Sequence, residues 1–276
     1  MAQEHSVPLV VWQETFRHMR FPGSLYQRAF ESMFGACVRA NGRRFIPRTT
    51  RARGFLRELG VEGPQITRWI PTGIDTDAYA PARSPDSVAA LGWPEDARIL
   101  VIVGRLHRSK GIDFALHVMK WLIGREPNVR LAIRGSGPEL GNLRALSGAL
   151  ALGGAVKFLG RLARQDMVDL YNAADIALCT SENDLLPFTL IEAGACGRPS
   201  ITTDVGAVRD IVLDGVTGDV VPERRVEAFG RTVLALLKDE ERRRAYGRNA
   251  RRRAEGLFAL PVVAQNLLEV YRGVAA

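Results

Sequence analysis

From Arg98 onward the chain alternates short apolar runs with helical segments, and this rhythm constrains the fold more than any other feature of the sequence. Six runs predict buried strands, at residues 98–103, 129–134, 156–159, 175–179, 199–202 and 218–221. Strands that are apolar throughout and alternate with helices are typical of a parallel sheet covered on both faces. We therefore expect residues from about 95 to 256 to form one doubly wound α/β domain.

The residues before this domain predict a smaller set of elements. Apolar runs favour strands at residues 7–12, 44–47 and 66–70. Capping residues favour helices at residues 24–37 and 50–59. The segment 77–94 contains three prolines and is predicted to be a linker with a small helix.

The composition is that of a soluble globular protein, with 46% hydrophobic and 25% charged residues. No apolar run approaches the roughly 20 residues that a membrane span needs, and the first residues show no signal-peptide pattern. The cysteines, at positions 37, 179 and 196, are widely spaced and lack any C-x-x-C pairing. This spacing argues against a disulfide framework or a zinc site and favours a reducing cytoplasm.

The formal net charge is +8, which favours anionic partners such as nucleic acid, an acidic membrane surface or a phosphorylated substrate. Many of the cations lie in the stretch from Arg242 to Arg253. We interpret this stretch mainly as a solvated helix face. It lacks an interleaved aromatic platform for bases, so no nucleic-acid partner is expected.

The loops that follow the predicted strands carry glycines, cations and carboxylates, at Gly104-Arg105, Gly135-Ser136-Gly137, Gly160-Arg161 and residues 180–184. The carboxyl ends of parallel strands meet at one edge of the sheet, where open α/β sheets bind ligands. These residues should therefore converge on one rim. Their convergence is stronger evidence for a site than any single motif.

The loop Gly104–Gly111 follows the first strand of the domain and opens a helix. Arg105 and Lys110 would stand near a helix N-terminus, where backbone amides and the helix dipole already favour an anion. The forked guanidinium of Arg105 and the ammonium of Lys110 would add positive charge that suits a diphosphate. The alternative is that both residues are surface cations without a ligand. No P-loop or dinucleotide-binding fingerprint is present. Gly135 and Gly137 fit a tight bend and ligand contact equally well.

The stretch 180–197 is a polar loop followed by Pro187 and a helix that ends at Gly197. Pro187 suits the first helical turn, so the anion-binding amides would come from Phe188 and Thr189. Glu192 lies about one turn further in, among apolar neighbours, where its carboxylate can accept hydrogen bonds from sugar hydroxyls. Asp184 lies before the helix, at the rim; the alternative is that it caps a helix or turn.

The run from Asn183 to Ala193 resembles the acid–seven residues–acid motif of family 4 glycosyltransferases, which are retaining enzymes of the GT-B fold. Gly104-Arg105-Leu106 with Lys110-Gly111 resembles the diphosphate-binding pair of the same family. Further segments follow in the family's order: Pro71-Thr72-Gly73-Ile74-Asp75, Ala174-Asp175, Gly197-Arg198-Pro199, Asp204-Val205-Gly206 and Asp214-Gly215-Val216-Thr217-Gly218. The resemblance covers about residue 60 to the end.

The resemblance implies a role for each site residue. Arg105 and Lys110 would hold the donor's diphosphate and stabilise the charge of the leaving group, in place of a metal ion. Asp184 would orient the transferred sugar, Glu192 would bind the ribose, and the Gly160 loop would lie beside the base. The other implied donor-binding residues are Gly135, Gly137, Leu186, Phe188 and Thr189. No metal and no other cofactor is expected.

The resemblance also implies an organisation: a complete C-terminal Rossmann-like doubly wound domain plus a partial N-terminal Rossmann-like domain. We expect a partial acceptor-side domain over residues 1–80, a linker over 81–97, the donor-binding domain over 98–256, and a helix over 257–276 that crosses back to the N-terminal domain. The sequence departs from the family pattern at Asp184, where glutamate is usual, and at Leu185, where glycine is common. The N-terminal part also lacks the family's glycine-rich first loop.

Two functions of different classes are compatible with these features. The first is a metal-independent, retaining hexosyltransferase that moves a sugar from a UDP- or GDP-linked donor to a hydroxyl of a sugar or lipid-linked acceptor, as in cell-envelope polysaccharide biosynthesis. It would work in the cytoplasm or peripherally at the inner face of an anionic membrane. The second is a truncated or split-enzyme donor-binding protein, completed by a partner chain and without transferase activity on its own. The sequence favours the enzyme.

Overall fold

The computed structural model describes residues 8–14, 23–82, 89, 91–161 and 163–275. The chain divides into two compact units. One comprises the residues up to Gly73 together with those from Leu257 to the C-terminus, and the other comprises Ile74–Gly256. No helix in the described ranges is long and apolar enough to cross a membrane.

The smaller unit is built on two parallel strands, β1 (Leu9–Gln13) and β2 (Gly42–Pro47). Between them the described chain is helical: α1 (Gly23–Phe30), a π-helical turn (Glu31–Gly35) and α2 (Ala36–Asn41). The unit also contains α3 (Thr50–Glu58), a 3-10 turn (Gly63–Gln65) and the C-terminal helix α11 (Leu260–Ala275). Thr49 caps α3, because its side chain accepts a hydrogen bond from the amide of Ala52.

Successive residues of β2 form two separate cores, because neighbouring side chains of a strand point to opposite faces. Phe45 packs with Leu56 of α3 and with Val61 and Ile66, and Ile46 packs with Ile70 and Val263 of α11. The C-terminal helix therefore covers a strand near the start of the chain.

The predicted strand at residues 66–70 is wrong. Ile66 forms a single bridge to Phe45, and the amides of Thr67 and Ile70 donate to carbonyls of β2, but no ladder follows. Ile66 and Ile70 are buried because each belongs to one of the two cores. Burial on both faces makes this segment apolar without making it a strand.

The larger unit is a six-stranded parallel sheet in the order β5-β4-β3-β6-β7-β8. Its strands are β3 (Arg98–Val103), β4 (Val129–Arg134), β5 (Val156–Gly160), β6 (Ile176–Cys179), β7 (Ser200–Thr203) and β8 (Gly218–Val221). The order reverses direction between β3 and β6, which lie side by side. This is the topological switch point of a doubly wound sheet, the place where open α/β sheets bind ligands.

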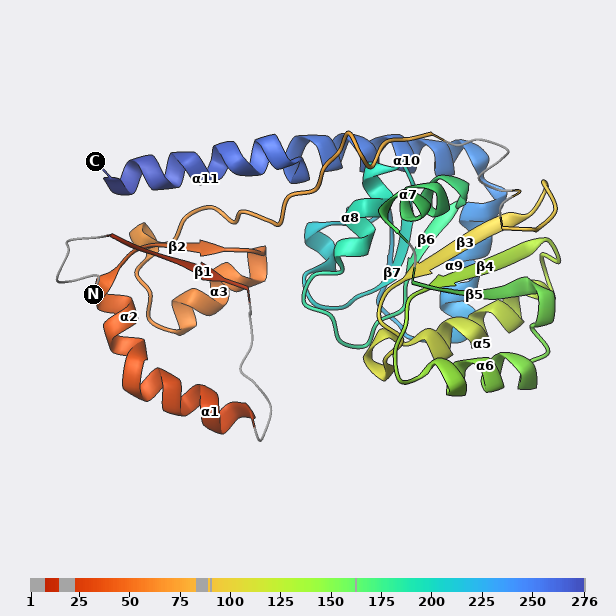
Figure 1. Ribbon diagram of the computed structural model, residues 1–276, viewed down its shortest axis with the longest axis horizontal. Coiled ribbons are helices and arrows are strands. Elements are labelled where there is room, and N and C mark those ends of the chain that lie inside the picture. The colour runs from red at the N-terminus through yellow and green to blue at the C-terminus, as the bar shows by residue number, and fades with distance from the viewer. Residues whose placement is uncertain (1–7, 15–22, 83–88, 90, 162, 276) are drawn as a thin grey trace. The chain divides into compact units, whose positions relative to one another are not determined.

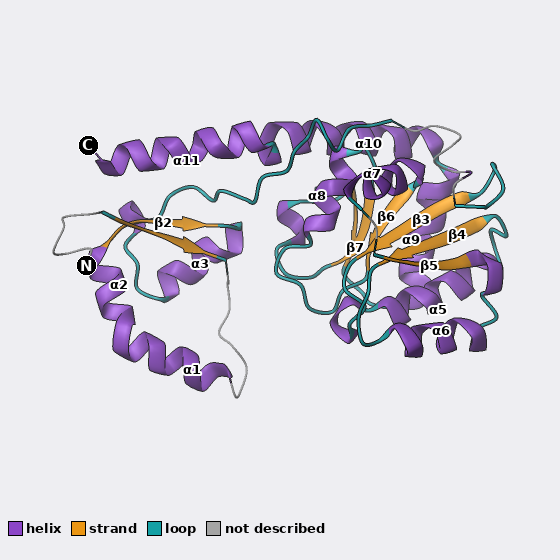
Figure 2. Cartoon of the chain, viewed as in Figure 1, coloured by secondary structure: helices purple, strands orange, loops and turns teal. Residues whose placement is uncertain are grey.

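Helices cover both faces of this sheet, with α5 and α6 on one side and α7 and α8 on the other (Figure 1). The helices are α5 (Ile112–Ile123), α6 (Leu140–Ala149), α7 (Arg164–Ala173), α8 (Phe188–Ala195), α9 (Val226–Lys238) and α10 (Glu240–Arg253). Figure 2 shows the strands of the sheet enclosed between these helices. A 3-10 turn, Val208–Asp210, lies between β7 and β8. The small helix predicted in the linker lies mainly outside the described residues.

The stretch Arg242–Arg253 forms α10, but its interpretation as a solvated helix face is wrong for part of the stretch. Arg243 is 7% exposed, and its Nη1 donates to the carbonyls of Leu236 and Leu237. Arg253 is half-buried and donates to the carbonyls of Ile211 and Asp210. These arginines satisfy backbone carbonyls at element ends, which the charge pattern alone does not reveal.

Candidate functional site

The loops after β3 and β6 are bound together at the switch point. Lys110 Nζ donates to Asp184 Oδ2 at 2.5 Å, and Thr180 Oγ1 donates to the carbonyl of Lys110 at 3.1 Å. The amide of Glu182 donates to the carbonyl of Ser109 at 2.9 Å. Two segments that the sequence singled out separately therefore form one structure at the carboxyl edge of the sheet.

Glycines allow these loops to approach each other closely. A Cβ at Gly135 would lie 1.7 Å from the carbonyl oxygen of Gly104, and one at Gly137 would lie 2.2 Å from that of Leu106. Gly111 has a left-handed backbone, and a Cβ there would lie 2.1 Å from the oxygen of Thr180. The requirement for glycine at these positions comes from contact between backbones of neighbouring loops.

A cavity of about 450 Å³ opens beside these loops. Its lining contains four arginines and one carboxylate, together with Gly135, Ser136 and Thr189; the five charged residues are Arg105, Arg134, Arg161, Arg164 and Glu192. The cavity therefore favours an anionic ligand that also carries hydroxyl groups for Glu192. The predicted residues Arg105, Gly135, Thr189 and Glu192 all meet here.

Glu192 is held by two tyrosines. Tyr171 donates to Oε2 at 2.7 Å, and Tyr79 donates to Oε1 at 3.2 Å. Tyr171 is almost fully buried and Tyr79 is 9% exposed. Each carboxylate oxygen keeps further acceptor capacity, so Glu192 is fixed in direction and can still accept hydrogen bonds from a ligand.

Asp184 is anchored from two sides but is not part of the cavity lining. Besides Lys110, its Oδ2 lies 3.5 Å from Ser181 Oγ, and its side chain is 13% exposed. The backbone of Gly206 packs closely against that of Asp184, since a Cβ at Gly206 would lie 1.9 Å from the carbonyl oxygen of Asp184. Lys110 and Asp184 form a charged pair at the switch point. Lys110, like Asp184, is not in the lining of the basic cavity, which includes Gly104 and Arg105 of the same loop.

The remaining predicted residues lie around these groups. The carbonyl of Gly160, a residue with φ of 69°, accepts from the amide of Gly135 at 2.8 Å. Leu186 and Phe188 are half-buried and are not in the cavity lining. The helix α8 begins at Phe188 with Pro187 as its N-cap residue, so the proline stands one position before the predicted first turn.

Sequence reasoning missed Tyr79, Tyr171, Arg134 and Arg164. Arg134 carries a usable signal, because a cation at the last position of a parallel strand, here directly after three apolar residues, must lie at the carboxyl edge of the sheet. The tyrosines carry none. Tyr79 lies in the segment before the domain's first strand, 113 positions from Glu192.

Alkaline pH should lower the free energy of unfolding, because the unfolded chain ionises Tyr79 more readily than the folded protein does. Burial, and then the charge of Glu192, raise the pKa of Tyr79 from 10.0 to about 12. The folded state therefore holds the phenolic proton more tightly than the unfolded chain. The contribution of protonated Tyr79 to the free energy of unfolding is complete below about pH 10 and is lost as the pH rises toward 12. In urea unfolding at pH 9 and pH 11, we expect Tyr79→Phe to lose less stability than the parent protein over this interval. Tyr26→Phe, at a side chain 78% exposed, is the control; an equal loss in Tyr79→Phe and the parent would contradict the assignment.

Solved structures resemble most of the chain. HepE of Anabaena, in complex with UDP, has a TM-score of 0.86 at 19% identity, covering 99% of this chain and 74% of that one. Sucrose-phosphate synthase from Thermosynechococcus elongatus has a TM-score of 0.76 at 28% identity, covering 89% and 61%. These likenesses confirm the predicted α/β fold of the GT-B type.

Curated relatives are similar over most of this chain. The D-inositol 3-phosphate glycosyltransferase of Kineococcus radiotolerans is 32% identical over 83% of this chain and 57% of that protein. The protein of the same name from Frankia alni is 30% identical over 85% and 60%. The chain thus spans less than two thirds of the length of these relatives. The model of the family described as glycosyl transferases group 1 matches residues 84–253, and together with these relatives it shows that the chain belongs to that family.

Proposed function

We propose that this chain transfers a sugar from a nucleotide-diphosphate donor to a hydroxyl acceptor, with retention of configuration and without a metal ion. The observation that carries the proposal is the basic cavity at the switch point, where four arginines surround a carboxylate fixed by two tyrosines. Family membership and the UDP complex of the structurally similar HepE support the same donor class.

In this proposal the cations bind the diphosphate. Arg105 presents a planar fork to phosphate oxygens, while Lys110 can keep its bond to Asp184 and still direct two further N–H groups at a phosphate. Negative charge grows on the diphosphate as the bond between the sugar's anomeric carbon and the phosphate oxygen breaks. Preorganised cations stabilise that charge more in the transition state than in the bound donor, which is the requirement for catalysis.

The carboxylates orient the rest of the donor. Glu192 would accept hydrogen bonds from the ribose hydroxyls, and Asp184 from hydroxyls of the transferred sugar. The acceptor's oxygen forms the new bond to the anomeric carbon, and its proton passes to the departing phosphate. This sequence of events requires no nucleophile from the protein.

Arg105→Ala tests the phosphate assignment. Losing a charge-assisted contact of about 1.5–3 kcal/mol should weaken UDP binding by roughly tenfold to a hundredfold. Calorimetric titrations with UDP, GDP and ADP give the parent affinities and identify the base.

Arg108→Ala is a matched control from the same loop. The Arg108 side chain is 83% exposed and pairs with Glu139, so its removal changes the net charge equally without touching the cavity. We expect its UDP affinity to stay within about twofold of the parent value. Equal affinities for both variants and the parent would remove Arg105 from the site. Donor binding without any sugar transfer or donor hydrolysis would refute the enzymatic proposal and leave a donor-binding protein.

A further inference from the structure

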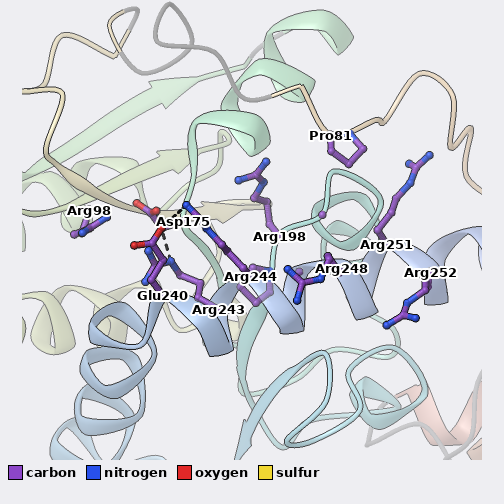
Figure 3. Close-up of a pocket in the computed structure, with 13 residues that line it drawn as sticks. Pro81, Arg98, Asp175, Arg198, Glu240, Arg243, Arg244, Arg248, Arg251 and Arg252 are labelled. Atoms are coloured by element: carbon purple, nitrogen blue, oxygen red, sulfur yellow. Dashed lines mark ion pairs between the residues drawn. The ribbon is translucent and has the colours of Figure 1, made fainter.

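A second hollow, of about 800 Å³, lies in the larger unit and is lined by seven arginines but only two carboxylates (Figure 3). Arg98 begins β3, Asp175 immediately precedes β6, and Pro199 immediately precedes β7. The hollow therefore lies at the amino edge of the sheet, opposite the carboxyl-edge cavity. Its other wall is α10, which supplies five of the arginines.

Three of the arginines are fixed by the protein and form rigid walls. Arg243 lies 3.7 Å from Asp175 and donates to two carbonyls. Arg198 donates to the carbonyls of Cys196 and Ala174, and Arg251 to those of Thr76, Tyr79 and Ala195. Carbonyls are neutral dipoles and cancel none of the positive charge of these guanidinium groups. Arg243 also lies near Asp175, and Arg251 also pairs with Glu255 at 2.7 Å.

Both carboxylates of the hollow are already engaged. Asp175 Oδ2 accepts from the amide of Ile99 at 2.8 Å, and its other oxygen faces Arg243. Glu240 pairs with Arg244 along one face of α10. Among the described residues, Arg98 and Arg248 have no side-chain hydrogen bond or ion pair, so their guanidinium groups remain available to a ligand.

We propose that this hollow binds a phosphate-bearing anion. Guanidinium forks match phosphate oxygens in pairs, and several cations held in one concave surface attract a multiply charged group much more strongly than a single charge. The lining contains no aromatic ring on which a base could stack, so the ligand is recognised by its phosphates. A free phosphorylated small molecule and a phospholipid headgroup share this chemistry.

Titration calorimetry with inorganic tripolyphosphate tests the proposal. All titrations use the Arg105→Ala variant as the starting protein, so that phosphate binding in the carboxyl-edge cavity is weakened equally in each. Adding Arg98→Ala and Arg248→Ala should lower the affinity by at least about tenfold. Adding Arg231→Ala, an arginine of α9 that pairs with Glu227, should change it by less than about twofold. Because the side chains of Arg98 and Arg248 make no hydrogen bond or ion pair with the residues that the structure describes, the triple variant should also unfold at a temperature close to that of Arg105→Ala.

The outcomes separate the sources of the phosphate. Tripolyphosphate binding that depends on Arg98 and Arg248 supports a soluble ligand. Capture only by vesicles containing phosphatidic acid, with the same dependence, supports a headgroup. Absence of binding in both assays overturns the proposal, as does binding that the Arg98→Ala/Arg248→Ala change affects no more than Arg231→Ala.

Discussion

Replacing Lys110 with alanine is expected to lower kcat/KM for sugar transfer by at least about a hundredfold, the effect of removing one preorganised charge from a transition state. Two losses combine. The ammonium no longer stabilises the leaving diphosphate, and Asp184, whose side chain is 13% exposed, loses the partner 2.5 Å away. A largely buried carboxylate without its cation should also lower the free energy of unfolding by about 1–3 kcal/mol. Steady-state kinetics with the donor identified by calorimetry, and urea unfolding, measure the two effects.

Lys120→Ala controls for the loss of a lysine, because Lys120 is exposed on α5. Its kcat/KM and stability should remain close to those of the parent protein. Transfer by Lys110→Ala within about threefold of the parent rate would show that Lys110 does not act on the diphosphate. A fall in stability without a fall in kcat/KM would limit its role to holding Asp184.

Replacing Gly135 with alanine is expected to cost at least about 3 kcal/mol of stability and to abolish donor binding. The φ of Gly135 is 150°, and the added Cβ would lie 1.7 Å from the carbonyl oxygen of Gly104. The obstruction is backbone, so no side-chain rotation relieves it. The loops after β3 and β4 would have to separate, which would displace Arg105 from the cavity. Urea unfolding and UDP titration measure both consequences.

Gly148→Ala is the matched control, since a Cβ there meets nothing within 4 Å and the residue lies in α6. Alanine in a helix is favoured over glycine, so stability should be unchanged or rise by up to about 1 kcal/mol. If Gly135→Ala were as stable as Gly148→Ala, the close approach of the two loops would not exist in the protein.

Strands of the larger unit were predictable because their signal is local. The bounds of β3, β4 and β8 agree with the apolar runs, since each strand is covered on both faces and contains few polar residues. The same signal failed at Ile66 and Ile70, which are apolar because they fill two separate cores. An apolar run reports burial, and only hydrogen-bonded pairing makes it a strand.

The candidate site was predictable only in part. Topology places the loops after parallel strands on one edge, so Arg105, Gly135 and Glu192 could be grouped from the order of elements. Gly135 and Gly137 were predicted to serve a bend or a ligand, and the structure adds a constraint that the sequence did not reveal, the contacts between neighbouring loop backbones. The pairing of Lys110 with Asp184 could not be derived from the spacing within either loop.

By itself, the sequence determined that a doubly wound parallel sheet would form and that cations, glycines and carboxylates would gather at its carboxyl edge, because strand periodicity and chain order are properties of neighbouring residues. Only the tertiary structure decided that Tyr79 and Tyr171 meet at Glu192, and that arginines from β3, α10 and the turn before β7 line one hollow at the opposite edge. Those arrangements depend on the directions in which side chains from distant segments point once helices pack on the sheet.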